Sequence, residues 1–176
     1  MIDLAEDPID DKSTLQTKSL LPAHPNYRES DDAIIQIGFT GTQLGMNETQ
    51  WARVHHLLYT IGPDTFVHGD CLGADHDFHR MVRQTFEPEA IDIIIYPPDN
   101  TIKRAFCDGD IVMDEAPYLV RNQSIIDACD ILIATPAEET EQRRSGTWST
   151  IRKARKSGKP IYIVPANAKA WWENQE

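Results

Sequence analysis

Positive charge and cysteine are both scarce in this 176-residue chain. Its 17 lysine and arginine residues stand against 28 aspartate and glutamate residues, which gives a net charge of -11. Binding to a nucleic-acid backbone needs a positive surface that releases counterions, so nucleic acid is not expected as a partner. The three cysteines, Cys71, Cys107 and Cys129, are odd in number and have no paired spacing. We therefore expect reduced thiols, no disulfide framework and a cytoplasmic location.

Long apolar runs and the common nucleotide-binding motifs are also missing. No apolar run approaches about 18 residues, so we expect a soluble protein without a membrane partner. The opening stretch, MIDLAEDPIDDKSTLQ, lacks the basic-then-apolar order of a signal peptide. Neither the Walker pattern nor GxGxxG is present, so the sequence does not indicate a nucleoside triphosphatase or an ordinary dinucleotide dehydrogenase, and no cofactor is predicted. A small anionic ligand stays possible, since an acidic protein can contain a local basic pocket.

The chain divides into an arm and one domain. Residues 1–32 carry eight acidic residues, three basic residues and three prolines, without sustained periodicity. This composition predicts a flexible or loosely docked amino-terminal arm, which is either a simple tail or a segment that docks on a partner subunit. Residues 33–176 are long enough for a single domain with a substantial core.

Apolar runs of strand length alternate with segments of helical periodicity throughout this domain. The predicted strands read AIIQIGF, TFVHG, IDIIIY, DILIAT and PIYIVPA, and the predicted helices read NETQWARVHHLLYTIG, GADHDFHRMVRQTF, VRNQSIIDAC and TWSTIRKARKS. Residues 97–117 are predicted to form a long polar loop. This alternation predicts a Rossmann-like α/β domain, with an open, mostly parallel sheet and helices on both faces.

Glycine-rich turns follow three of the predicted strands. In open parallel sheets ligands lie beyond the carboxyl ends of the strands, and glycine allows N–H groups at a helix start to approach an oxyanion. Each turn alone is equally compatible with tight packing of a strand against a helix, but three at one edge favour a phosphate-binding site. Its candidate residues are Gly38, Thr40, Gly41, Thr42 and Gln43 in the first turn, His68, Gly69, Gly73 and Ala74 in the second, and Ser145, Gly146 and Thr147 in the third.

Five segments in this order resemble the SLOG superfamily. They read GFTGT, VHGDCLGAD, YPPD, RNQSII and SGTWSTIRKARKSGKPIYIV, and they cover roughly residues 35–164. This Rossmann-like group contains the LOG phosphoribohydrolases, the DNA-processing protein A family and a subgroup of small single-domain proteins of uncertain function, to which the chain is most similar. The resemblance implies a homo-oligomer that binds a nucleotide-like small molecule. It implies that the phosphate lies against residues 40–43 and 146–147, with Asp75, Arg121 and Asn122 around the sugar.

The chain departs from the LOG enzymes at the third turn. Their pattern is similar to Pro-Gly-Gly-x-Gly-Thr-x-x-Glu, whereas this chain has Arg143 and Arg144 in place of the paired glycines and Thr150 in place of the catalytic glutamate. A threonine cannot act as a carboxylate base or stabilise an oxocarbenium-like centre by charge. Two functions therefore stay open. The chain is a sensor or ligand-binding module, or it is an N-glycosidic hydrolase or transferase acting on nucleoside 5′-monophosphates, with Asp75 as the candidate catalytic carboxylate.

Histidine and cysteine gather around the second turn without forming a known metal-binding pattern. His68, Cys71, His76 and His79 fall within twelve residues, but the Cys-x4-His-x2-His spacing is not that of a standard zinc finger. Cys71 precedes the predicted helix, whereas His76 and His79 share one of its faces. The sequence therefore predicts hydrogen-bonded or solvated histidines and no metal site.

Overall fold

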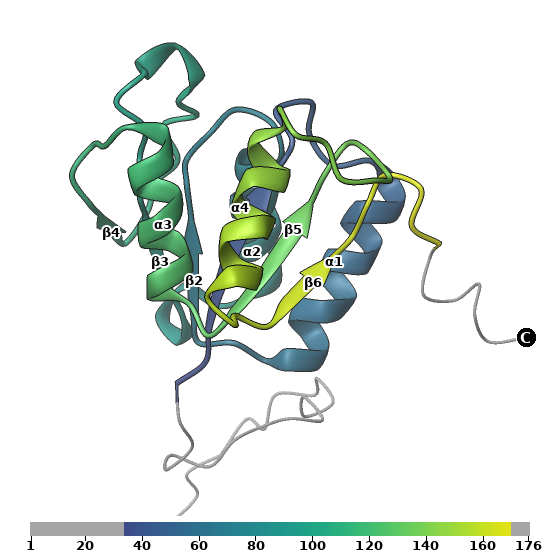
Figure 1. Cartoon of the computed structure of the whole chain (residues 1–176). Coiled ribbons are helices and arrows are strands. Elements are labelled where there is room, and N and C mark those ends of the chain that lie inside the picture. Colours follow the sequence, from purple (N-terminus) through teal and green to yellow (C-terminus); the bar gives the residue numbers. More distant parts are fainter. Residues whose placement is uncertain (1–33, 170–176) are drawn as a thin grey trace, which may run out of the picture.

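The computed structural model of the chain describes residues 34–169 (Figure 1). The predicted amino-terminal arm, residues 1–32, lies outside the described residues. Within residues 34–169, no helix is long and apolar enough to cross a membrane.

Six strands form one sheet in which every neighbouring pair is parallel. They are β1 (Gln36–Gly41), β2 (Thr65–His68), β3 (Asp92–Ile95), β4 (Ile111–Val112), β5 (Ile131–Thr135) and β6 (Ile161–Ile163). Their order across the sheet is β4-β3-β2-β1-β5-β6. This arrangement confirms the predicted open, Rossmann-like α/β fold. The sequence did not predict β4, because two residues are too few to give an apolar pattern.

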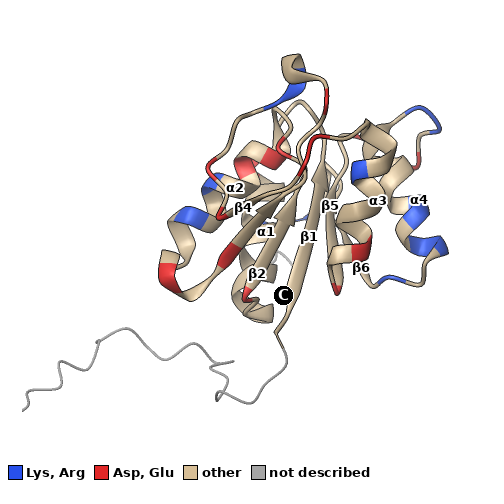
Figure 2. Cartoon of the chain, turned by 90° about the vertical axis from the view of Figure 1, so that its left-hand side faces the viewer, with Lys and Arg blue, Asp and Glu red and all other residues tan. Residues whose placement is uncertain are grey.

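Four α-helices cover the two faces of the sheet, α1 and α2 on one and α3 and α4 on the other (Figure 1). They are α1 (Glu48–Ile61), α2 (Ala74–Thr85), α3 (Tyr118–Ala128) and α4 (Gly146–Lys156), with short 3-10 turns η1 (Pro88–Ala90) and η2 (Thr101–Lys103). Helix α4 carries basic segments along its length (Figure 2). They include Lys153, Arg155 and Lys156 in its last turn, where cations complement the helix dipole.

The two faces of the sheet have separate cores because successive side chains of a strand point to opposite faces. Phe66 packs in the core under α1 and α2, whereas its neighbour Val67 packs in the core under α3 and α4. In the first core the rings of Phe39 and Phe78 stack with their centroids 4.2 Å apart. This contact fixes α2 against the central strand β1.

Local signals place the start and the end of α1 as the sequence predicts. Asn47 is the N-cap and forms a capping box with Gln50: the Gln50 N–H donates to Asn47 Oδ1 at 2.8 Å, and the Asn47 N–H donates to Gln50 Oε1 at 3.1 Å. Gly62 ends the helix in the left-handed region, at φ 62°, where a side chain would be strained. Asn47 therefore ends the turn after β1, and Gly62 begins the connection to β2.

The strand order places a topological switch point between β1 and β5. From β1 the chain adds β2, β3 and β4 on one side, and it then adds β5 and β6 on the other side. The turns that leave β1 and β5 therefore diverge, and open α/β sheets bind their ligands in the crevice that such turns leave.

The loop between β3 and β4 folds back onto the turn between β2 and α2. The Ala105 N–H donates to Asp70 O at 2.7 Å, and the Leu72 N–H donates to Lys103 O at 2.9 Å. These bonds bring a segment predicted to be irregular against the carboxyl end of β2.

Candidate functional site

The turns after β1, β2 and β5 pack directly on one another at Gly41. A Cβ atom on Gly41 would lie 2.4 Å from both Ala74 Cβ and Thr135 Oγ1, so only glycine fits there. The Thr42 N–H donates to Thr135 O at 3.1 Å, and Thr42 O accepts the Ala74 N–H at 2.9 Å. The first turn therefore caps α2 with its own carbonyl group, and the Ala74 N–H is already engaged within the protein.

A buried arginine and a buried carboxyl group lie behind Gly69, at the end of β2. Arg121 on α3 is 3 % exposed and Asp75 on α2 is 5 % exposed. Arg121 Nη1 lies 3.9 Å from Asp75 Oδ2, and Arg121 Nη2 lies 2.9 Å from Cys71 Sγ. A Cβ atom on Gly69 would lie 1.4 Å from Arg121 Nη1, so the guanidinium fits only because residue 69 is glycine. Among the described residues, Arg121 Nε has no hydrogen-bond partner.

Burial dominates the acid–base properties of this cluster. It raises the pKa of Asp75 to about 6, although the charge of Arg121 and the N–H groups of Cys71 and Gly69 favour the carboxylate. Burial, followed by the charge of Asp75, raises the pKa of Cys71 to about 11. Near neutral pH Asp75 can therefore gain or lose a proton, whereas Cys71 stays a thiol.

The first turns of α3 and α4 are joined next to this cluster. The Tyr118 hydroxyl lies against Gly146, where a Cβ atom would come within 2.2 Å of it. The ring of Tyr118 also packs under the Arg121 guanidinium, with Cζ 4.8 Å from the ring centroid. The Asn122 side-chain amide donates to Thr150 Oγ1 at 2.8 Å in the interior. Thr150 therefore has a structural hydrogen-bond partner in Asn122.

His68 faces a different set of residues. The Asp70 N–H donates to His68 Nδ1 at 3.1 Å, which places the His68 proton on Nε2, 3.1 Å from His79 Nδ1. Burial, followed by the charge of His79, lowers the pKa of His68 to about 3, and burial also lowers the pKa of His79. Cys107, from the loop between β3 and β4, lies beside both rings. Its pKa is raised by burial and by its hydrogen bond with Asp70.

Two cavities open at the carboxyl edge on either side of residues 137–138. The first has a volume of about 300 Å³ and lies beyond β1. Its lining residues are Thr42, Leu44, Gly45, Met46, Asn47, Gln50, Ala137 and Ala166. The second has a volume of about 500 Å³ and is lined by Glu138, Gln142, Arg143, Arg144 and Ser145, at the start of α4. A third cavity, of about 290 Å³, lies away from this edge and is lined by residues of α1, β6 and the segment after it.

Most of the predicted site residues fall into two groups in the structure, and Ser145, Gly38 and His68 have other surroundings. One group lies where the first turn packs on α2, and it consists of Thr40, Gly41, Thr42, Gln43, Gly73 and Ala74. The other lies around the first turns of α3 and α4, and it consists of Gly69, Asp75, Arg121, Asn122, Gly146 and Thr147. Ser145 is the N-cap of α4 and lines the second cavity. Gly38 lies within β1, where a Cβ atom would be 2.6 Å from Cys129 Sγ, and His68 faces His79.

Sequence reasoning missed three contributors to this region. Tyr118 precedes the predicted third helix by two residues, and only Pro117 at the helix start marks the boundary that includes it. Arg104 binds the buried Asp70 through Nε at 2.8 Å, and Cys107 reaches the histidines from a loop without a regular pattern. Arg104 and Asp70 are 34 positions apart in the sequence, and contacts over such separations leave no local signal in one sequence.

Comparison with known proteins supports the fold. No family of known proteins and no curated protein matches the sequence. A solved structure that is similar is the molybdenum cofactor binding protein from the phototrophic bacterium Rippkaea orientalis, with a TM-score of 0.57 and 19 % sequence identity over 76 % of this chain and 77 % of that one. At this identity the similarity shows a shared fold.

Proposed function

We propose that the protein binds a nucleotide or a nucleotide-derived small molecule at the carboxyl edge of its sheet, as a sensor or ligand-binding module. The observation that carries this proposal is the pair of cavities at the switch point between β1 and β5. Ala137 lines one cavity and the next residue, Glu138, lines the other, and the two linings differ in chemistry as the two ends of a nucleotide do.

The second cavity has the chemistry of a phosphate site. Arg143 and Arg144 line it with Ser145, the N-cap of α4. Helix N-termini leave N–H groups without intrahelical acceptors, and arginine forms paired hydrogen bonds with phosphate oxygens. Among the described residues, Glu138 Oε2 is buried without a hydrogen-bond partner, and Glu138 lines the same cavity. A carboxylate oxygen in that position is suited to accept from the hydroxyl groups of a sugar.

The first cavity has the chemistry of a site for a base. Leu44 and Met46 give it apolar surface, while Thr42 and Asn47 give it polar groups. Leu44 is 87 % exposed, so its side chain is available to a ligand in the free protein. The cofactor named for the similar protein from Rippkaea orientalis is also a small molecule, which supports the ligand class without identifying the ligand of this chain.

Titration calorimetry on the full chain tests the proposal. The ligands are the four common ribonucleoside 5′-monophosphates, the corresponding nucleosides and inorganic phosphate. We expect at least one nucleotide to bind and its nucleoside to bind more weakly. Replacing both Arg143→Gln and Arg144→Gln should weaken nucleotide binding by on the order of 100-fold, because each charge-assisted hydrogen bond contributes about 1.5–3 kcal/mol.

The matched control removes two positive charges elsewhere. Arg80→Gln with Lys156→Gln changes exposed residues on α2 and α4 and leaves both cavities intact. Equal loss of affinity in the two double variants, or the absence of binding by every nucleotide, would refute the proposal.

A second candidate function is hydrolysis of an N-glycosidic bond, and the observation that favours it is the raised pKa of Asp75. A carboxyl group with a pKa of about 6 can exchange a proton near neutral pH, as a general acid or base must. Incubation with the same nucleotides, followed by chromatography for free base, tests this activity. A rate of base release that changes with a midpoint near pH 6, and that is lost in Asp75→Asn, would support the hydrolase function. Nucleotide binding without base release would eliminate this function.

A further inference from the structure

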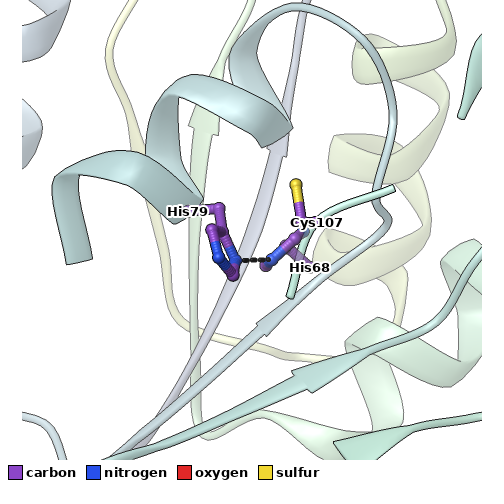
Figure 3. A group of neighbouring side chains, drawn as sticks. All are labelled: His68, His79 and Cys107. Carbon is purple, nitrogen blue, oxygen red and sulfur yellow. Dashed lines mark hydrogen bonds between the residues drawn. The ribbon is translucent and has the colours of Figure 1, made fainter. Parts of the chain in front are cut away.

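Three side chains that can bind metal converge at the end of β2 (Figure 3). His68 is the last residue of β2, His79 lies on α2, and Cys107 comes from the loop between β3 and β4. Their ligand atoms, one from each residue, all lie within 4.8 Å of one another. His68 is fully buried and His79 is 8 % exposed. None of the three lines the two cavities at the switch point, so this cluster is separate from the proposed nucleotide site.

The spacing of the two ring nitrogens is close to that of ligands on one tetrahedral ion. Two nitrogens bound at 2.0–2.1 Å around such an ion lie about 3.4 Å apart. His68 Nε2 and His79 Nδ1 are 3.1 Å apart, so they need to separate by only a few tenths of an ångström. A thiolate bound at about 2.3 Å lies about 3.6 Å from each nitrogen. The three ligand atoms lie within 4.8 Å of one another, so the thiol has to approach the nitrogens by at most about 1.2 Å.

We propose that His68 Nε2, His79 Nδ1 and Cys107 Sγ bind a zinc ion, with water at the fourth position. Two imidazoles and a thiolate suit Zn²⁺ and related borderline-soft cations, whereas Mg²⁺ and Ca²⁺ prefer oxygen ligands. Cys107 is only partly buried, so solvent can reach the open position from its side of the cluster. Three protein ligands with an open position are also the arrangement of catalytic zinc sites.

Zinc binding requires a rearrangement of protons that the hydrogen bonds define. In the structure the His68 proton is on Nε2, because Nδ1 accepts the Asp70 N–H. Binding through Nε2 moves that proton to Nδ1 and breaks the bond from Asp70. His79 already presents its lone pair at Nδ1, and Cys107 releases its thiol proton to solvent. Binding therefore exchanges three hydrogen bonds, His68 with His79, Asp70 with His68 and the Cys107 thiol with Asp70, and one thiol proton for three metal–ligand bonds. About one proton is released per ion.

Asp70 already holds the Cys107 ligand near the histidines. Asp70 Oδ1 accepts the Cys107 N–H at 2.8 Å, and Asp70 Oδ2 accepts from Arg104 Nε at 2.8 Å. The Asp70 side chain is fully buried, so this anchor is part of the interior. The ion would then join β2, α2 and the loop between β3 and β4 at one point.

Cobalt substitution on the full-length, reduced protein tests the site. After removal of metal with a chelator, Co²⁺ is added while the near-ultraviolet and visible spectra are recorded. We expect one ion per chain, a thiolate-to-cobalt charge-transfer band, and displacement of the ion by Zn²⁺ but not by Mg²⁺. Cys107→Ser should abolish the charge-transfer band, and His79→Gln should weaken binding by on the order of 100-fold or more.

Two matched variants separate this site from general thiol and histidine binding. Cys129→Ser changes a buried cysteine in the core under α3, and His76→Gln changes an exposed histidine one turn from His79. Both should bind Co²⁺ like the wild type, with folding of every variant checked by circular dichroism. The absence of a charge-transfer band in the folded wild type, or its persistence in Cys107→Ser, would overturn the proposal.

Discussion

Asp75→Asn should change how the stability of the protein depends on pH. Burial raises the pKa of Asp75 from 3.8 to about 6 in the folded protein. The folded state therefore favours the protonated carboxyl group, and this contribution to stability is fully present below pH 3.8 and lost as the pH rises through 6. At 1.36 kcal/mol per pKa unit, the interval corresponds to about 3 kcal/mol.

Asparagine keeps a carbonyl oxygen to accept the Cys71 N–H but cannot ionise. The free energy of unfolding of the wild type, measured relative to Asp75→Asn, should therefore fall by about 2–3 kcal/mol between pH 4 and pH 8. The attraction between Arg121 and the ionised carboxylate is already included in the pKa of about 6, and a difference in packing that is constant with pH does not affect this slope. Most of the fall should lie between pH 4 and pH 6.

Urea unfolding followed by circular dichroism at five pH values measures the effect. Asp127→Asn removes one exposed negative charge on α3 and controls for the change in net charge. Two results would refute the reasoning from burial. The free energy of unfolding of the wild type, relative to Asp75→Asn, would stay constant between pH 4 and pH 8, or it would rise with pH.

Three further substitutions test contacts around the same edge by urea unfolding. Gly69→Ala places a Cβ atom 1.4 Å from Arg121 Nη1 and should cost about 1–3 kcal/mol, whereas a neutral effect would show that the guanidinium is free to move. Thr150→Val removes the 2.8 Å hydrogen bond from Asn122 and should cost about 1–3 kcal/mol, with Thr150→Ser retaining most of the stability. Asn47→Ala removes the N-cap of α1 and should cost about 1–2 kcal/mol, and equal stability of Asn47→Ala and Asn47→Asp would contradict the capping role.

The sequence predicts the elements of this fold well because their signals are local. The apolar run of β5 and the capping box at Asn47 each lie within a few residues, and the structure has both where they were expected. The all-parallel sheet follows from the alternation of strands and helices. Among the strands in residues 34–169, β4 alone was not predicted, because two residues are too few to give an apolar pattern.

The candidate site was harder to predict because its contacts are not local. The glycine pattern indicates the correct edge of the sheet, but it does not show that Thr42 O accepts the Ala74 N–H. The resemblance implies that Arg121 lies around the sugar of a ligand, whereas in the structure the residue is 3 % exposed and contacts Asp75 and Cys71. Such outcomes depend on which residues meet from three different turns, and a single sequence does not contain that information.

The place of β1 at the centre of the sheet also sets a constraint on synthesis. β1 is the first strand of the domain, yet its pairing on one side joins Ile37 to Ile131, 94 residues later. At about 5–20 residues per second, a ribosome needs roughly 5–20 s to supply that partner. During this interval the edge of β1 that later pairs with β5 has unpaired N–H and C=O groups, and such an exposed edge makes a growing chain prone to aggregation. Variants that slow the docking of β5 should therefore lower the yield of folded protein more than their equilibrium stability predicts.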